Sequence, residues 1–295
     1  MMDYTCFFAA LFVFTGNLLL TIYGGIEKSR PTFQWNLYKT LDPSFLQEHW
    51  VDRRDLSALH MAGSFIVAIS WVTLTIPIVQ AAFILSHGGK RKLWMHTMMV
   101  TLAVSAATTE FVSRLMHVGS WNTGNWVSLD FYLDEWAGNP QSPNGIGWKS
   151  LEITYQLAQG SVLWIDSWEY FAVFGIMLCI FISVRTAQSG YLGDSMGWAG
   201  MGLFIGLLSL ADFIFTFVRF KNWDTYNIIV IIFSIMIRLI LLPAWLIILA
   251  FNLPPAVQEF NEIRAANPLN QPLSPKNSAG SPTPSPRPSD FTIED

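Results

Sequence analysis

The chain has 295 residues, of which 52% are hydrophobic and only 13% are charged, and its mean hydropathy is +0.38. Soluble globular domains carry about 25% charged residues, so this composition indicates a membrane protein whose apolar residues are gathered in long runs. A net charge of −4 without a basic block argues against nucleic-acid binding. Two cysteines are too few for a disulfide framework or a cysteine-ligated zinc ribbon.

Six segments are long and apolar enough to cross the hydrocarbon core of a bilayer as helices, which takes about 20 residues each. We therefore predict an all-α integral membrane protein in which residues 1–253 form a six-helix polytopic bundle. The predicted crossings are residues 7–23, 59–85, 93–118, 162–184, 196–218 and 228–251. The first segment lacks the basic start and the small-residue cleavage site of a signal peptide, which favours a retained helix over a cleaved one.

The orientation of the bundle is predicted from the basic residues near the helix ends. The densest basic cluster, Lys90-Arg91-Lys92, lies in the turn between the second and third crossings, and cytoplasmic loops are enriched in Lys and Arg. We therefore expect this turn and both termini in the cytoplasm, and the long connections 24–58 and 119–161 on the outer side. The five basic residues of the first long connection oppose this orientation. The sequence does not indicate which membrane holds the protein.

The two outer connections are expected to be folded. Asp42-Pro43, followed by apolar residues at helical spacing up to Trp50, has the N-cap and first-turn proline of a short interfacial helix. The second connection mixes aromatic residues with Gly, Asn and Pro, which predicts an aromatic-rich cap loop over the outer end of the bundle. Its aromatic residues include Trp121, Trp126, Phe131, Tyr132, Trp136 and Trp148.

Residues 254–295 are predicted to form a disordered cytoplasmic tail. Pro254-Pro255 follow the sixth predicted crossing, and residues 268–295 contain seven prolines and many Ser, Thr and Asn. Such a composition has too few apolar residues to build a core. The tail is a candidate for recruiting cytosolic partners.

Charged residues inside the crossings carry most of the functional information, because each costs about 2.5–3.5 kcal/mol at the bilayer centre on insertion scales. Helical spacing puts those of the third crossing on one face, and those of the fourth on another. At 1.5 Å of rise per residue, all of them fall in the outer half of the bundle. The candidate pocket residues are His60, Glu110, Arg114, His117, Asp166, Glu169, Asp212 and Arg238.

Two interpretations of these residues stay open. In the structural one, Glu110 and Arg114 form an i,i+4 ion pair, and Arg238 pairs with Asp212 or Glu169, so that the charges only hold the helices in register. In the functional one, they line an outward-facing polar and acidic pocket of a transporter-like or receptor-like protein. Its ligand would be a cation, a proton or a small polar molecule, and the excess of carboxylates over arginines favours a cation.

Other functions stay open beside these two. The spacing of His60 and His96 is similar to that in transmembrane di-haem cytochromes b, but that family needs two further ligands, and no histidine follows His117. A single haem between His60 and His117, or between His87 and His96, is the remaining b-type haem hypothesis. A membrane-embedded enzyme and a structural bundle with a recruiting tail also fit the sequence. The cofactor is unknown from sequence.

Overall fold

The computed structural model describes residues 2–30, 43–86, 93–133, 146–186, 192, 196–218 and 223–266, and the secondary structure of these ranges is helical. Residues Met1–Phe260 form one unit, and Asn261–Asp295 form a second. The helices are α1 (Tyr4–Ser29), α2 (Pro43–Asp55), α3 (Ser57–Leu85), α4 (Leu93–Leu133), α5 (Ile146–Thr186), α6 (Met196–Val218), α7 (Trp223–Ile235), the π-helical stretch η4 (Met236–Leu241) and α8 (Leu242–Ala266).

Among the described residues, five helical stretches are long and apolar enough to cross a membrane. These are Tyr4–Ser29, Ser57–Leu85, Gly147–Thr186, Met196–Thr216 and Ile231–Glu262. Their outward-facing side chains include large apolar ones that are about half exposed, such as Phe65, Ile69 and Phe204. A large apolar surface of this kind suits lipid better than water. The helices therefore indicate an integral membrane protein.

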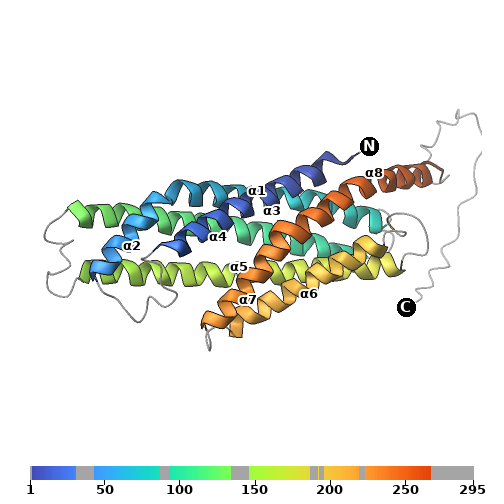
Figure 1. The fold of residues 1–295 in the computed structure, drawn as a ribbon. Helices are drawn as coiled ribbons and strands as arrows, with labels where there is room; N and C mark the ends of the chain where they lie inside the picture. The colour runs from blue at the N-terminus through green and yellow to red at the C-terminus, as the bar shows by residue number, and fades with distance from the viewer. Residues whose placement is uncertain are drawn as a thin grey trace, which may run out of the picture. The chain divides into compact units, whose positions relative to one another are not determined.

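The predicted third crossing, residues 93–118, lies within α4, which is not one of the five apolar stretches. α4 is less apolar because it contains His96, Glu110 and Arg114 together with several Ser and Thr. It nevertheless runs alongside both α3 and α5 (Figure 1). The count of six crossings therefore stays a prediction.

The ends of the apolar helices agree with the sequence prediction to different degrees. α6 has the predicted bounds, whereas α1 begins three residues earlier than predicted, at Tyr4. The Asp3 carboxylate accepts hydrogen bonds from the backbone N–H groups of Thr5 and Cys6, at 2.8 and 3.0 Å. An N-cap of this kind satisfies donors that have no partner within the helix, which explains the start of α1.

α4 and α5 correct the predicted boundaries of the outer connection. Each has 41 residues and is therefore about 60 Å long, twice the thickness of a hydrocarbon core. Residues 119–133 and 146–161, predicted as parts of a cap loop, are thus helical; Trp136 lies outside the described residues. The reason is that Trp121, Gly124, Asn125 and Ser128 recur on one face of α4 and are all buried there.

α2 confirms the predicted short helix and contacts the long extensions of α4 and α5. Its Leu46 and Trp50 are fully buried. The Trp50 ring lies so close to α4 that a Cβ atom added at Gly124 would be 2.7 Å from Trp50 Cζ3. A real Cβ needs more space than this, so the close contact between α2 and α4 depends on the glycine.

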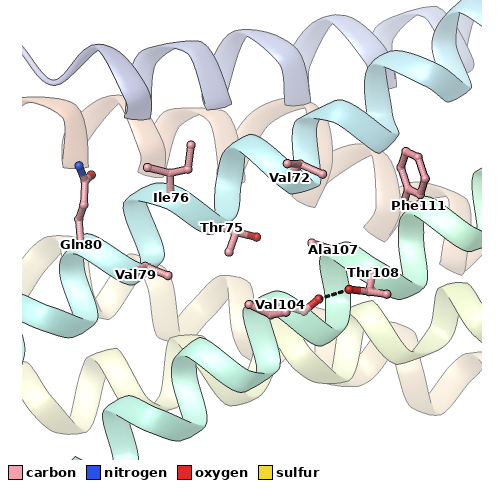
Figure 2. A pocket seen from close by; sticks show the side chains of 9 residues that line it. All are labelled: Val72, Thr75, Ile76, Val79, Gln80, Val104, Ala107, Thr108 and Phe111. Carbon is pink, nitrogen blue, oxygen red and sulfur yellow. Dashed lines mark hydrogen bonds between the residues drawn. The ribbon is translucent and has the colours of Figure 1, made fainter.

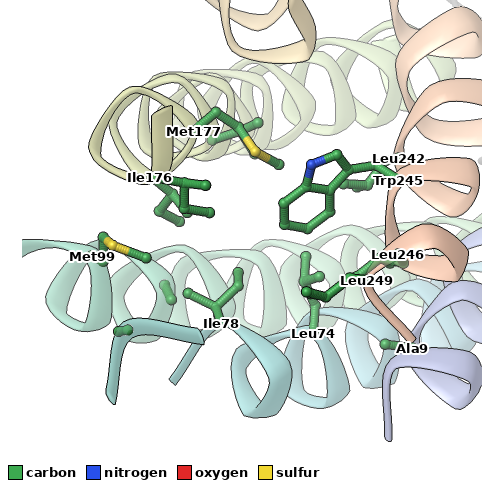
Figure 3. Packing of buried hydrophobic residues seen from close by; sticks show 14 of the residues in the cluster. Ala9, Leu74, Ile78, Met99, Ile176, Met177, Leu242, Trp245, Leu246 and Leu249 are labelled. Atoms are coloured by element: carbon green, nitrogen blue, oxygen red, sulfur yellow. The ribbon is translucent and has the colours of Figure 1, made fainter. Parts of the chain in front are cut away.

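The main hydrophobic core lies between α1, α3, α4, α5 and α8 (Figure 3). The Trp245 ring points from α8 into this core, where Leu74, Ile78, Ile176 and Met177 lie around it. It also stacks on Trp198 of α6 at 4.8 Å between ring centroids. Aromatic rings contribute large buried areas, so Trp245 is a main anchor of α8 against the bundle.

The segment α7–η4–α8 replaces the predicted sixth crossing, 228–251, and corrects the predicted start of the tail. The π-helical turn ends where Leu242 N–H donates to the carbonyl of Ile237, five residues back. Pro243 has no N–H, so it cannot donate the hydrogen bond that an α-helix forms to the carbonyl four residues back. This missing hydrogen bond explains the wide turn. α8 then continues through Pro254 and Pro255 to Ala266, instead of ending before residue 254.

The extension of α8 has a physical reason in its apolar side chains. Leu253, Ala256 and Phe260 are buried, and the Phe260 ring contacts Phe83 of α3 at 5.3 Å between centroids. This apolar face favours continued helix despite the two prolines. Residues 267–295, predicted as the disordered tail, lie outside the described residues.

A pair of glycine substitutions tests the close contact between α2 and α4. Gly124→Ala should destabilise the protein by about 1–3 kcal/mol, because Trp50 must move to admit the methyl group. Gly119→Ala, in the same helix, is the matched control: its Cβ meets no atom within 4 Å, and alanine favours helix over glycine by about 1 kcal/mol. Thermal unfolding in detergent measures both. Equal midpoints for the two variants would contradict the predicted contact.

Candidate functional site

The structure brings five of the eight sequence-predicted residues into one cluster of buried charges, which we call the ion-pair cluster. Its buried members are Glu110 and Arg114 of α4 and Glu169 of α5, and its partly buried members are Asp166 of α5 and Arg238 of η4. His60 and His117 lie in a separate aromatic cluster. Asp212 of α6 is buried and interacts electrostatically with Tyr170, which in turn contacts Arg238.

Arg114 lies at the centre of the ion-pair cluster and connects α4 to α5. Its Nε donates to Glu110 Oε1 at 2.6 Å, which is the i,i+4 pair that the sequence predicts. Its Nη2 lies 3.7 Å from Asp166 Oδ2, and Asp166 also accepts a hydrogen bond from the Ser113 hydroxyl. Arg114 therefore holds one carboxylate of its own helix and one of α5.

Arg238 pairs with Glu169 and not with Asp212, which decides between the two partners that the sequence allows. Its guanidinium also lies over the Tyr170 ring, 4.8 Å from the ring centroid. The Tyr170 hydroxyl in turn lies 2.9 Å from Ser234 Oγ of α7. Buried charges are tolerated when they are paired and hydrogen-bonded, and this pair connects η4 to α5.

A cavity of 380 Å³ borders the ion-pair cluster, and we call it the polar pocket. One wall is a stripe along α1 and another is formed by α7 and η4, while Arg114 and Asp166 come from α4 and α5. Four ionisable side chains line it: Lys28, Arg114, Asp166 and Arg238. The other lining residues are Asn17, Leu20, Thr21, Gly24, Gly25, Ile231, Ser234, Ile235 and Leu239.

The α1 wall is the part of the pocket that sequence reasoning missed. Asn17, Thr21, Gly24 and Lys28 are spaced by three or four residues and therefore share one helical face. This face combines small and polar residues within an apolar helix. That pattern in the sequence could have indicated that α1 lines a polar cavity. In the sequence, Lys28 stands out only as a basic residue opposing the predicted orientation.

A larger cavity of 630 Å³ lies between α3 and α4 and has a different character (Figure 2). It is lined mostly by aliphatic side chains, including Val72, Ile76 and Val104, each about half exposed. The Thr108 hydroxyl donates to the carbonyl of Val104 at 2.8 Å, and so is satisfied by its own helix. With no ionisable lining residue, this groove suits apolar chains and is not the predicted polar site.

His60 and His117 pack against each other and against aromatic rings. Their ring centroids are 4.5 Å apart, His60 stacks on Trp121 at 4.4 Å, and Tyr23 lies 5.0 Å from His60. Both ring nitrogens of His60 and Nδ1 of His117 are buried without a hydrogen-bond partner in the described part of the chain. Rings in direct contact leave no room for a porphyrin between them, so the pair does not fit as the two axial ligands of one haem.

The second haem hypothesis involves His96, whose Nε2 lies 3.3 Å from the Ser183 hydroxyl oxygen of α5. Its proposed partner, His87, lies outside the described residues. Within the described ranges, no three His, Cys, Asp or Glu side chains form a group that could hold a metal ion. The geometry of the described histidines therefore gives the haem hypothesis no support.

A further buried ion pair, outside the ion-pair cluster, lies between α2 and α5 and was not anticipated. Arg53 Nη1 donates to Glu152 Oε2 at 2.7 Å, and Gln156 also donates to Glu152, at 2.6 Å. The guanidinium of Arg53 is 4.7 Å from the Trp50 ring centroid and 4.4 Å from that of Tyr155. Because both charged residues fall in predicted connections, sequence reasoning did not include them among the candidate site residues. The sequence offered one indication: Trp50 and Arg53 are three residues apart and therefore share a face of the predicted short helix.

No family model matches this chain, and no similar protein was found among curated proteins or solved structures. The ion-pair cluster, the Arg53–Glu152 pair and the polar pocket therefore carry the functional interpretation.

The Arg238 pair can be tested by combining substitutions. Arg238→Leu leaves Glu169 buried without its partner, and removal of one member of a buried pair typically costs about 3–5 kcal/mol. Replacing both members by apolar residues is often near neutral, so adding Glu169→Leu should restore most of the stability. Adding Asp212→Leu instead should not. Unfolding in detergent measures all three, and rescue by Asp212→Leu would contradict the observed pairing.

The pH dependence of stability should have a contribution from His49 of α2. Burial, and secondly the charge of Arg53, lowers the pKa of His49 from 6.5 to about 4, although Glu152 and Asp52 act in the opposite direction. The unfolded chain therefore binds a proton between pH 6.5 and pH 4 that the folded chain does not, so acidification through this range destabilises the protein.

A substitution isolates this contribution. His49→Phe removes the titrating group, and both ring nitrogens of His49 lack a hydrogen-bond partner among the described residues, so no bond is lost. Unfolding midpoints measured from pH 7 to pH 4 should fall less steeply for the variant than for the wild type. One group contributes at most about 1.4 kcal/mol per pH unit. Unchanged pH dependence would show that His49 takes up its proton over the same pH range in the folded and the unfolded chain, and would contradict the lowered pKa.

Proposed function

We propose that this chain is a transporter-like or receptor-like membrane protein whose polar pocket binds a small polar ligand. The observation that carries this proposal is a 380 Å³ cavity lined by four ionisable side chains, on helices long and apolar enough to cross a membrane. Small-molecule sites typically have volumes of about 300–1,000 Å³ and combine apolar walls with a few placed polar groups. The polar pocket has both properties.

The energetics favour a working site over a purely structural one. Charged side chains in membrane-spanning segments are expensive and usually mark a substrate or ion pathway. A purely structural ion pair needs only its partner, as Arg53 and Glu152 illustrate. Arg114 and Arg238 have such partners, yet both also border open volume together with Lys28. The additional cavity is what a structural role does not require.

We place α4 as a further crossing, because α4 packs along both α3 and α5. Six crossings put both termini on the cytoplasmic side, and the polar pocket in the outer half of the bundle. Lys28 near the end of α1 and Asp166 in α5 belong to that half. Recruitment of cytosolic partners by residues 267–295 is a separate proposal.

A purely structural bundle is the second candidate function. It is favoured by the two pairs Glu110–Arg114 and Glu169–Arg238, in which each arginine already has a carboxylate partner without a ligand. The two candidates differ in whether the polar pocket contains water and ligand or is closed in the membrane.

Cysteine labelling distinguishes these candidates. Both native cysteines, Cys6 and Cys179, are free and buried, and are replaced by alanine in the background protein. Gly24→Cys should react readily with a charged, water-soluble methanethiosulfonate reagent, because it lines the polar pocket and its Cβ meets no atom within 4 Å. Ile22→Cys is the control at the same depth on the outward face of α1, where Ile22 is 44% exposed and does not line the pocket.

The expected result in reconstituted vesicles is fast modification of Gly24→Cys and slow modification of Ile22→Cys, since the thiolate that reacts forms in water and not in lipid. If neither cysteine reacts, the polar pocket is dry and the structural candidate is correct.

A further inference from the structure

We infer that the ligand of the polar pocket is an anionic amphiphile, bound by a phosphate or carboxylate headgroup. This inference rests on the proposed function and names the chemistry of its ligand. It reverses the preference for a cation that the sequence suggests, and the reason is the position of the carboxylates relative to the cavity.

The charges that line the polar pocket are mainly positive. Lys28, Arg114 and Arg238 line it, whereas Asp166 is the single carboxylate among its lining residues. Glu110 and Glu169 are each about 1% exposed and neutralise the arginines away from the cavity. The excess of acidic residues in the sequence is therefore not an excess at the cavity wall.

The oxygens of Asp166 are also engaged by neighbouring side chains. Oδ1 accepts a hydrogen bond from Ser113, and Oδ2 faces Arg114. A cation entering the pocket would compete with these contacts and would meet three positive side chains. An anion meets them favourably, and the Asp166 carboxylate is already screened by Arg114.

The two guanidinium groups retain donors suited to an anion. A guanidinium carries five N–H donors in a planar fork that matches phosphate and carboxylate oxygens. Arg238 uses Nη2 for Glu169, and its side chain is still 16% exposed. Lys28 adds an ammonium group from the opposite wall. Charges from α1 and η4 thus face one cavity, as two-sided recognition of a headgroup requires.

The walls around these charges suit an aliphatic chain. Leu20 of α1 and Ile231, Ile235 and Leu239 of α7 and η4 line the same cavity. A Cβ added at Gly24 or Gly25 would meet no atom within 4 Å, so the volume is open beside α1 at these positions. Because these helices face lipid, we place the entrance there, with the headgroup at the arginines and the chain directed toward the bilayer.

The test uses the purified 295-residue chain in a neutral detergent and measures its thermal unfolding midpoint with two phospholipids, with inorganic phosphate and with an alkyltrimethylammonium detergent. A short-chain phosphatidic acid should raise the midpoint with increasing concentration, because a ligand that binds only the folded state stabilises it. Phosphatidylcholine with the same chains should have little effect, as its headgroup adds a quaternary ammonium. Inorganic phosphate should also have little effect, as it lacks the chains.

Two variants and a control connect the response to the pocket. Gly24→Leu should abolish the shift by filling the cavity, whereas Gly200→Leu in α6, also into open space but outside the pocket lining, should keep it. Lys28→Gln should weaken binding roughly tenfold or more, as expected for loss of one charge-assisted hydrogen bond.

The remaining outcomes are informative in different ways. An equal shift with inorganic phosphate would overturn the amphiphile and leave a free anion as ligand. A shift with an alkyltrimethylammonium detergent, and none with phosphatidic acid, would overturn the anion altogether. Neither result affects the proposed pocket, which stands on the reactivity of Gly24→Cys. A shift that persists in Gly24→Leu would place the lipid elsewhere on the protein and overturn the inference.

Discussion

The arrangement of α4, α5 and η4 depends on one constraint: a charge removed from water must have its partner inside the protein. In these helices Arg114 and Arg238 are such cations, and each is matched by a buried carboxylate. Because Glu169 is in α5 and Arg238 in η4, their pairing fixes the rotation of both helices. Apolar contacts alone tolerate small rotations, whereas a buried ion pair does not.

The π-helical turn follows from the same constraint together with Pro243. The proline cannot donate a backbone hydrogen bond, and the widened turn before it changes the direction in which Arg238 projects relative to α8. Trp245, two residues after Pro243, anchors α8 in the hydrophobic core. The π-helical turn therefore allows one helical segment to form both the Arg238–Glu169 ion pair and the apolar contacts of Trp245.

Aromatic rings lie between the Arg53–Glu152 pair and the ion-pair cluster. Trp121 contacts His60, and Arg53 lies 5.9 Å from its ring centroid. His117, which contacts His60, is three residues from Arg114 on α4. The extensions of α4 and α5 are therefore a folded layer with its own ion pair, and this layer is continuous through α4 with the ion-pair cluster.

The sequence by itself determined the helical class, the positions of the apolar helices and, within the predicted crossings, the charged residues that had to be paired. These follow from the local 3.6-residue period and from the cost of burying a charge, both of which are visible in a single segment. Only the tertiary structure decided that Arg238 meets Glu169, that α4 and α5 continue as helices, and that the cavity wall is mainly cationic. Those outcomes depend on how one helix is rotated and shifted relative to another. The hydrophobic periodicity of a single helix does not specify that rotation or shift.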